Sequence, residues 1–171
     1  MRTLAPLTPA EITGLVCPWC GRAPERGERG FKAVRNGRTI GAVVLAAALR
    51  DRDLCPPGTY VIERLWVHPD DVGEHVGTQL VQRACSLLVA DRGRILVAYG
   101  TDGVPDCAHL PASWLASAGF AEHVDGVQWR IDLRRTLPLA GLARDAAAMA
   151  SRLVRPRSHP EPAARLQRNK H

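Results

Sequence analysis

The pattern of apolar and polar side chains predicts one central strand and a long helix after it. From Tyr60 to Val67 the side chains alternate in a period of two, which predicts a β-strand that ends at Pro69. Strict alternation would place Glu63 and Leu65 on the same face of this strand. From Val76 to Asp91 the apolar residues recur at helical spacing and predict an amphipathic helix. The rest of the chain is arranged around this pair of elements.

Turn and capping residues define the remaining elements. Thr8, Pro9 and Glu11 form a typical helix start, with Thr8 as the cap and Pro9 as the first helical residue. Asn36-Gly37 between two extended segments predicts a tight hairpin, because both turn positions need positive φ. The strands flanking the long helix form a βαβ unit and should therefore be parallel. The other predicted strands are 3–7, 31–35, 39–48, 94–99, 120–124 and 127–133; the other helices are 9–16, 111–118 and 141–154, with a loop at 100–110.

Length and composition bound the class of protein. With 171 residues, 46% of them hydrophobic and 23% charged, the chain is typical of one soluble globular domain with a short appendage. The apolar run at residues 41–49 is far shorter than the roughly 18 residues of a membrane span. Residues 1–11 lack the apolar segment of a signal peptide, so a cytoplasmic location and no membrane partner are expected.

The net charge of +6 is carried mainly by the C-terminal segment. Residues 151–171 hold six basic residues and one acidic residue, a net of +5, which leaves +1 for residues 1–150. This segment has no interleaved aromatic residues and no recognisable nucleic-acid-binding motif. We therefore expect a basic, disordered tail, and nucleic-acid binding is disfavoured.

The connector between the central strand and its helix has the composition of an anion-binding loop. Gly73 and Gly77 lie where several backbone N–H groups can converge on a phosphate, with the helix dipole behind them. The spacing Val67-x-Pro69, then Val72-Gly73-x-His75-x-Gly77-x-x-Leu80, resembles the acyl-CoA-binding motif of the GCN5-related N-acetyltransferases (GNAT). Two positions depart from that motif, because Val72 replaces Arg or Gln and His75 replaces the first glycine. Glu74 also adds a negative charge beside the proposed pyrophosphate site.

A second segment, Trp114 to Phe120, resembles the other signature of this family, in which a helix ends at Gly-Phe before the last hairpin. The resemblance covers about residues 3–135, and the paired cysteines with the segments 65–69, 107–112 and 129–133 resemble a bacterial-type branch. It implies an α+β fold with α/β/α layers, in which a mixed, mostly antiparallel sheet contains the central parallel βαβ unit. It assigns residues 1–137 to an acetyltransferase domain, 138–155 to an appended helix and 156–171 to the basic tail.

The resemblance also implies the chemistry, which is direct attack of an amine on acetyl-CoA. Glu63 lies on the central strand where the family commonly has its base; alternatively, it forms a salt bridge to an arginine at a sheet edge. Leu115 stands where the family usually has its acid, a tyrosine. The substitutes within reach are Cys107, His109 and Ser113, each of which is alternatively a loop or capping residue.

By the same resemblance, backbone groups of the central strand would pair with the pantetheine arm of acetyl-CoA, and the loop would hold its pyrophosphate. The strand residues are Leu65, Trp66 and Val67, and the loop residues are Gly73, His75, Val76, Gly77 and Thr78. Segments 17–30 and 50–58 would line the acceptor pocket. The acceptor is expected to be a small-molecule or peptide amine, and a homodimer is left open.

Cys17 and Cys20 are the closely spaced pair among five cysteines. A zinc site would need two more ligands, and the sequence has no second pair with metal-ligand spacing. Cys107 or His109 would complete such a site only by folding back onto the pair. We therefore expect two half-buried structural cysteines and no metal, with zinc, a disulfide or redox chemistry as the alternatives.

Together these observations predict an N-acetyltransferase that transfers acetyl from acetyl-CoA to an amine. The alternative is a non-catalytic acyl-CoA-binding or protein-interaction module that keeps the fold. The departures at Val72, Glu74, His75 and Leu115 favour that alternative.

Overall fold

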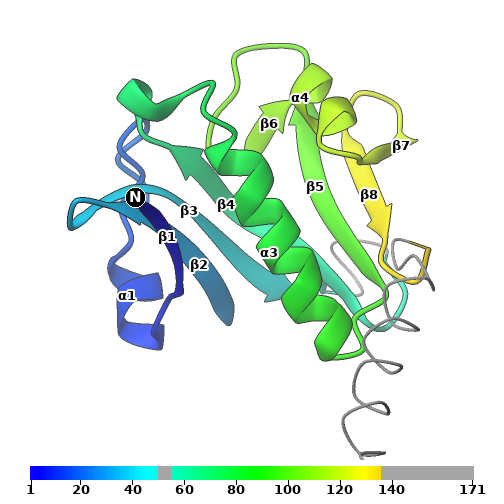
Figure 1. Ribbon diagram of the computed structural model, residues 1–171. Coiled ribbons are helices and arrows are strands. Elements are labelled where there is room, and N and C mark those ends of the chain that lie inside the picture. The colour runs from blue at the N-terminus through cyan, green and yellow to red at the C-terminus, as the bar shows by residue number, and fades with distance from the viewer. Residues whose placement is uncertain (50–54, 136–171) are drawn as a thin grey trace, which may run out of the picture. The chain divides into compact units, whose positions relative to one another are not determined.

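A mixed β-sheet forms the centre of residues 1–49 and 55–135, the part of the chain that the computed structural model describes (Figure 1). The helix predicted at 141–154 and the basic tail lie outside these residues. In chain order the elements are β1 (Arg2–Pro6), α1 (Pro9–Gly14), β2 (Arg29–Arg35), β3 (Arg38–Ala47), β4 (Thr59–Val67), the 3-10 helix η1 (Pro69–Asp71), α3 (Val76–Ala90), β5 (Ile95–Thr101), β6 (His109–Pro111), α4 (Ala112–Ser117), β7 (Ala121–Val124) and β8 (Gln128–Asp132).

The strand order along the sheet is β1-β2-β3-β4-β5-β8-β7, and β6 pairs with β5 outside this path. Within the described residues the β4–β5 and β5–β6 pairs are parallel and the other pairs are antiparallel. The predicted mixed sheet with its parallel βαβ unit is therefore confirmed. No helix in the described part of the chain has both the length and the apolar character needed to cross a membrane.

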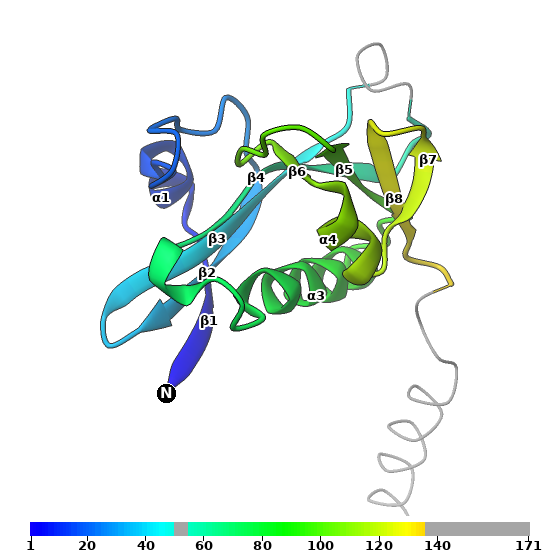
Figure 2. The ribbon, with the colours of Figure 1, turned by 90° about the horizontal axis from the view of Figure 1, so that it is seen from above.

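Helices cover both faces of the sheet (Figure 2). On one face, α3 packs against β2, β3 and β4 and buries the predicted apolar stripe. Leu80 and Leu88 of this stripe are fully buried, and each such side chain stabilises the fold by about 1.5–3 kcal/mol. On the other face, Ile12 of α1 packs with Leu7 and Val44 in a smaller cluster. The layers are thus α/β/α, as predicted.

The predicted turns and caps form as their residue types require. Asn36 and Gly37 have φ values of 51° and 77°, so the hairpin between β2 and β3 is closed by two residues of positive φ. The Thr8 hydroxyl accepts a hydrogen bond from the Glu11 N–H, and the Glu11 carboxylate accepts one from the Thr8 N–H. At the end of α4, the N–H of Phe120 donates to the Leu115 carbonyl at 3.0 Å, as in a Schellman motif.

Candidate active site

A β-bulge in the middle of β4 interrupts the predicted alternation of its side chains. Val44 of β3 pairs with Arg64, but the next residue, Leu45, pairs with Ile62, so Glu63 is the extra residue. The prediction of strict alternation was therefore wrong at this point, because a bulge shifts the side-chain phase by one residue. Ile62 consequently lies in the same core cluster as Leu65, beneath α3.

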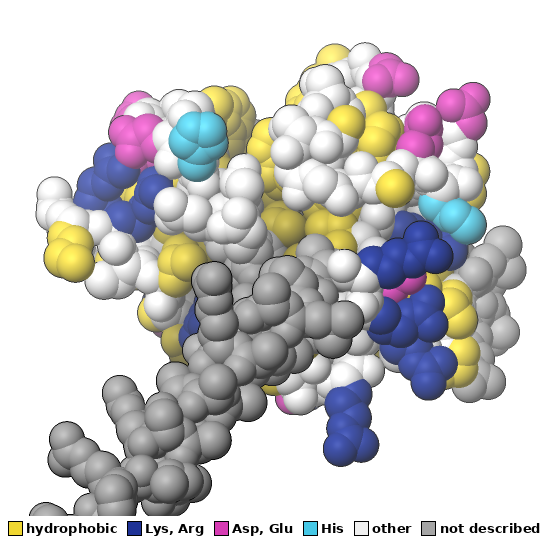
Figure 3. Space-filling view, turned by 45° about the vertical axis from the view of Figure 1, so that its right-hand side comes forward, with side chains coloured by type: hydrophobic (Ala, Val, Ile, Leu, Met, Phe, Trp, Pro, Cys, Tyr) yellow, Lys and Arg dark blue, Asp and Glu magenta, His cyan; other side chains and the backbone are white. Residues whose placement is uncertain are grey.

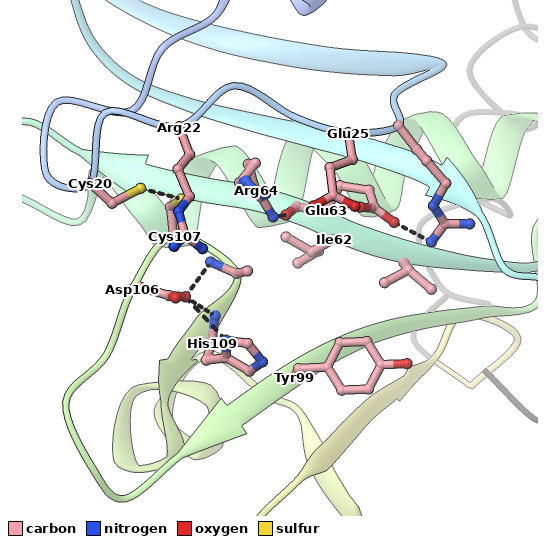
Figure 4. A pocket seen from close by; sticks show the side chains of 13 residues that line it. Cys20, Arg22, Glu25, Ile62, Glu63, Arg64, Tyr99, Asp106, Cys107 and His109 are labelled. Atoms are coloured by element: carbon pink, nitrogen blue, oxygen red, sulfur yellow. Dashed lines mark hydrogen bonds and ion pairs between the residues drawn. The ribbon is translucent and has the colours of Figure 1, made fainter. Parts of the chain in front are cut away.

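A pocket of about 350 Å³ lies beside this bulge (Figure 4). Its walls come from the loop after α1, from β4, from β5 and from the segment leading into β6. Glu63 and Cys107, the two predicted catalytic residues, both line it, and so does His109, whereas Ser113 is not among the lining residues. The lining residues are Cys20, Arg22, Glu25, Arg26, Val61, Ile62, Glu63, Arg64, Tyr99, Asp106, Cys107, Ala108 and His109.

Glu63 is held in the pocket wall by two arginines. A terminal nitrogen of Arg26 donates to its carboxylate, and only 12% of the Glu63 side chain is exposed. Nη1 of Arg64 donates to the backbone carbonyl of Glu63 at 2.7 Å. The alternative of a salt bridge is thus present in the structure, and the role of Glu63 as a base stays a prediction. The ion pair fixes the carboxylate at the edge of the cavity.

Asp106 and His109 form a hydrogen-bonded pair on another wall of the pocket (Figure 4). One carboxylate oxygen of Asp106 accepts the N–H groups of Ala108 at 2.8 Å and His109 at 2.6 Å, and it lies 3.2 Å from Nδ1 of His109. Burial tends to raise the pKa of Asp106, but the hydrogen bonds from the His109 and Ala108 backbone hold it below its ordinary value. The carboxylate therefore orients the imidazole and leaves Nε2 available.

Cys107 meets the N-terminal cysteine pair beside the same pocket. Its Sγ lies 3.2 Å from Sγ of Cys20, and Cys17 belongs to the same group of sulfur atoms. Cys17 and Cys107 are buried, whereas Cys20 is exposed. Burial and the hydrogen bonds with Cys20 and Cys17 raise the pKa of the Cys107 thiol above its ordinary range. The segment that carries Cys107 therefore folds back onto the pair Cys17 and Cys20, which was the condition for a metal site.

The N-terminus of α3 presents uncapped backbone N–H groups. His75, at the N-cap, has a φ of 57° and makes no side-chain capping bond, and Gly73 before it has a φ of 88°. The N–H groups of Val76, Gly77 and Thr78 precede the first intrahelical bond, which runs from Gln79 to His75. With the helix dipole behind them, they form a ready site for an anion such as a phosphate.

Glu74 does not leave an unpaired negative charge in this loop. Its carboxylate binds Arg35, and Nη1 of Arg2 donates to its backbone carbonyl at 3.0 Å. The hydrogen bond from Arg35 lowers the pKa of Glu74 below its ordinary value. Arg35 also lies 2.9 Å from the buried carboxylate of Asp71. On the face shown in Figure 3, two groups of basic side chains likewise have acidic side chains next to them.

Gly77 has a packing role in addition to any role in binding. A Cβ atom at this position would lie 3.1 Å from the ring of Trp114 and 3.7 Å from a methyl group of Val67. Such contacts are tighter than ordinary van der Waals distance on the Trp114 side, so glycine lets the indole pack onto the first turn of α3. The need for glycine at position 77 is therefore explained in part by packing, and not only by a role in binding.

The gap between the C-terminal ends of β4 and β5 is filled by β6 and the residues before it (Figures 1 and 2). Parallel pairing of β4 with β5 ends at Val61, and beyond it β6 pairs with β5 instead. The N–H of Leu65 donates to the carbonyl of Cys107 at 2.8 Å, and Nε1–H of Trp19 donates to the carbonyl of Val67 at 2.6 Å. The loop predicted at 100–110 was therefore wrong at both ends, since β5 continues to Thr101 and His109 begins a strand.

Several acetyltransferases of known structure share the fold of this chain. No family model and no curated protein matches the sequence. Among solved structures, the ribosomal-protein-S18-alanine N-acetyltransferase of Escherichia coli matches with a TM-score of 0.55 at 17% identity over 78% of this chain and 94% of that one. The IAA acetyltransferase of Bacillus cereus gives 0.54 at 16% identity over 77% and 99%. The catalytic domain of the Tetrahymena GCN5 histone acetyltransferase, in complex with coenzyme A, gives 0.54 at 10% over 81% and 96%. This chain has the GNAT fold.

Within the GNAT fold, the residues present fit one end of acetyl-CoA better than the other. The uncapped N–H groups at the start of α3 suit the pyrophosphate, and Glu74 is neutralised by Arg35. The pantetheine arm would have to displace two hydrogen bonds to pair with β4, because the Leu65 N–H and the Val67 carbonyl are bonded to Cys107 and Trp19 of the chain itself. Trp66 lies opposite Ala42, so its backbone groups face β3.

Several residues of this site were missed by the sequence analysis. Asp106 orients His109, Arg26 fixes Glu63, and Trp19 covers Val67. The spacing of Asp106 three residues before His109 is the one local signal, because a carboxylate can cap a turn of that length. The contacts of Arg26 and Trp19 span 37 and 48 residues and have no local signal.

Proposed function

We propose that this chain is an acyl-CoA-dependent N-acetyltransferase that acts on a small-molecule or peptide amine. The observation that carries the proposal is a GNAT sheet in which the bulge of β4 aims Glu63 into a pocket. The uncapped start of α3 follows the end of the same strand and supports it. Acetyl-CoA would supply the acetyl group, with the loop Gly73 to Thr78 as the site for its pyrophosphate.

Glu63 is the proposed base that takes a proton from the acceptor amine, and Arg26 holds its carboxylate in position. Of the predicted proton donors, Cys107 and His109 line the pocket. We favour His109, because Asp106 fixes its ring and 57% of its side chain is exposed, whereas Cys107 is 4% exposed. The proton donor must be able to reach the CoA sulfur, which is the leaving group.

The direct test is to incubate the protein with acetyl-CoA and a panel of amines and to measure the release of the CoA thiol. With any amine that reacts, Glu63→Gln should lower kcat by about 10²–10⁴-fold, as loss of a general base does. Glu28→Gln is the matched control. It makes the same chemical change outside the pocket, and its amide oxygen can still accept the hydrogen bond from Ala47. Equal activity of the Glu63 variant and the control would refute the assignment.

A second candidate is a non-catalytic acyl-CoA-binding or protein-interaction module. The specific observation in its favour is the hydrogen bond from Leu65 to Cys107, with which the segment before β6 fills the gap beside β4. Leu115 at the position of the usual tyrosine also favours it, since this side chain is fully buried in the core. Calorimetric binding of acetyl-CoA without turnover of any amine would support this module over the enzyme.

A further inference from the structure

Three cysteine sulfurs converge beside the pocket, from segments far apart in the sequence. The Sγ atoms of Cys17, Cys20 and Cys107 all lie within 4.8 Å of one another, and those of Cys20 and Cys107 are 3.2 Å apart. Three sulfurs that bind one zinc ion at about 2.3 Å lie roughly 3.8 Å from each other in tetrahedral geometry. The spacing of the cluster spans this value, so an ion can bind all three with small side-chain rotations.

Hydrogen-bonded turns hold the three ligands in place before any ion binds. The N–H of Cys17 donates to the Arg22 carbonyl at 3.0 Å, and the N–H of Gly21 donates back to the Cys17 carbonyl at 2.9 Å. This turn brings Cys20 next to Cys17. Cys107 lies in a second turn, closed by the N–H of Asp106 on the His109 carbonyl at 2.9 Å. The backbone on both sides of the cluster is therefore preorganised.

We propose that Cys17, Cys20 and Cys107 bind one zinc-class metal ion as thiolates. Three thiolates select a soft, tetrahedral ion, and binding displaces the thiol protons into solvent. Cys20 and Cys107 line the pocket, so water or a ligand in the cavity would be able to supply the fourth coordinating atom. Arg22 lines the same wall and offers a positive charge beside the anionic cluster (Figure 4).

Such an ion would join two segments that both lie against β4. One segment carries Trp19, which bonds the Val67 carbonyl, and the other carries Cys107, which bonds the Leu65 N–H. Metal binding thus stabilises the arrangement that fills the gap next to β4. It also removes Cys107 from the candidate proton donors, because a metal-bound thiolate has no proton to give.

Metal analysis of the full chain, purified under reducing conditions and with any affinity tag removed, tests the proposal. We expect one zinc ion per chain by elemental analysis. Co²⁺ added to the metal-free protein should give a thiolate-to-cobalt charge-transfer band. Cys20→Ser should weaken Co²⁺ binding at least about 100-fold, more than the loss of an outer-shell partner costs. Cys20 is exposed, so this variant should fold even if the buried Cys107→Ser does not.

Cys85→Ser is the matched control, because Cys85 lies half-buried on α3, outside the cluster. It should bind Co²⁺ as the unmodified protein does. Absence of metal, or an equal loss in Cys85→Ser and Cys20→Ser, would overturn the proposal. A Cys20–Cys107 disulfide found by mass spectrometry, with no Co²⁺ binding after its reduction, would overturn it too. None of these readouts needs acetyl-CoA, so they are independent of the proposed enzymatic activity.

Discussion

Trp19→Phe should tighten the binding of acetyl-CoA although it removes a hydrogen bond from the free protein. Nε1–H of Trp19 donates to the Val67 carbonyl at 2.6 Å, and Val67 is one of the residues predicted to pair with the pantetheine arm. This bond must break before the arm can reach the strand. Phenylalanine keeps an aromatic ring at the position and removes the donor, so the strand is freed at lower cost.

The expected size of the effect follows from the exposure of the bond. A hydrogen bond contributes about 0.5–1.5 kcal/mol net, and we take the lower half, about 0.5–1 kcal/mol, because water competes for a donor on an exposed side chain. The Trp19 side chain is 59% exposed. At 1.4 kcal/mol per factor of ten, the Kd for acetyl-CoA should fall roughly two- to fivefold. The free energy of unfolding should fall by the same amount, so affinity and stability change in opposite directions.

Isothermal titration calorimetry with acetyl-CoA measures the affinity, and urea unfolding measures the stability. Trp129→Phe is the matched control: it makes the same change of indole to phenyl, but Nε1 of Trp129 has no acceptor among the described residues, and Trp129 lies on β8, outside the residues predicted to bind acetyl-CoA. This control should leave the affinity unchanged. Unchanged or weaker acetyl-CoA binding in Trp19→Phe, with both variants folded by circular dichroism, would show that Trp19 does not cover the donor site.

Three further predictions concern the loop, the N-terminal cap and the core. Thr78→Glu adds a carboxylate to the first turn of α3, which should stabilise the helix by about 0.3–1 kcal/mol but weaken acetyl-CoA binding. Thermal unfolding measures the stability and calorimetry measures the binding. Gln82→Glu, one turn later, is the control and should change neither quantity. The hydrogen bond from Lys32 lowers the pKa of Glu11 from 4.5 to about 2, so its contribution to stability is present above pH 4.5 and is lost as the pH falls through about 2. The Tm of Glu11→Gln should therefore lie below that of the unmodified protein at neutral pH and converge with it over this window; a constant difference would contradict the assignment. Leu115→Ala empties a fully buried position and should cost about 2–5 kcal/mol in urea unfolding, and a cost below about 1 kcal/mol would contradict the packing described.

The sheet and its long helix could be predicted because local signals agree with the final packing. Asn36-Gly37 permits one tight turn, and Thr8 with Glu11 caps one helix, so these elements need no distant partner to be recognised. The apolar stripe from Val76 onward is long enough for its period to be unambiguous. Each of these segments has the same preference alone as in the fold.

The bulge at Glu63 and the strand β6 could not be predicted, because both depend on a partner strand. A bulge is defined by the register with β3, and the alternation of β4 alone does not reveal it. β6 spans three residues, His109–Pro111, too few for a period, and it is a strand because Tyr99 to Thr101 of β5 lie beside it. Length and register, rather than propensity, decide such elements.

The candidate site also contains residues that local motifs predict and residues that only a distant partner determines. Glu63 and the loop around Gly77 were reached through a resemblance carried by contiguous motifs. The meeting of Cys107 with Cys20 joins residues 87 positions apart, and only the path of the chain around β4 brings them together. The sequence showed that a metal site would require Cys107 to meet the pair Cys17 and Cys20, but it could not show that the fold brings them together.

The two hydrogen bonds that occupy β4 have a thermodynamic consequence for the proposed ligands. The metal would bind best when Trp19 and Cys107 lie on the strand, and the acyl donor would bind best when they do not. Two ligands with opposite preferences for one equilibrium are antagonists, and linkage requires that each weaken the other by the same factor. Zinc availability would then act as an input on acyl transfer, and a high concentration of acyl donor would promote release of the ion.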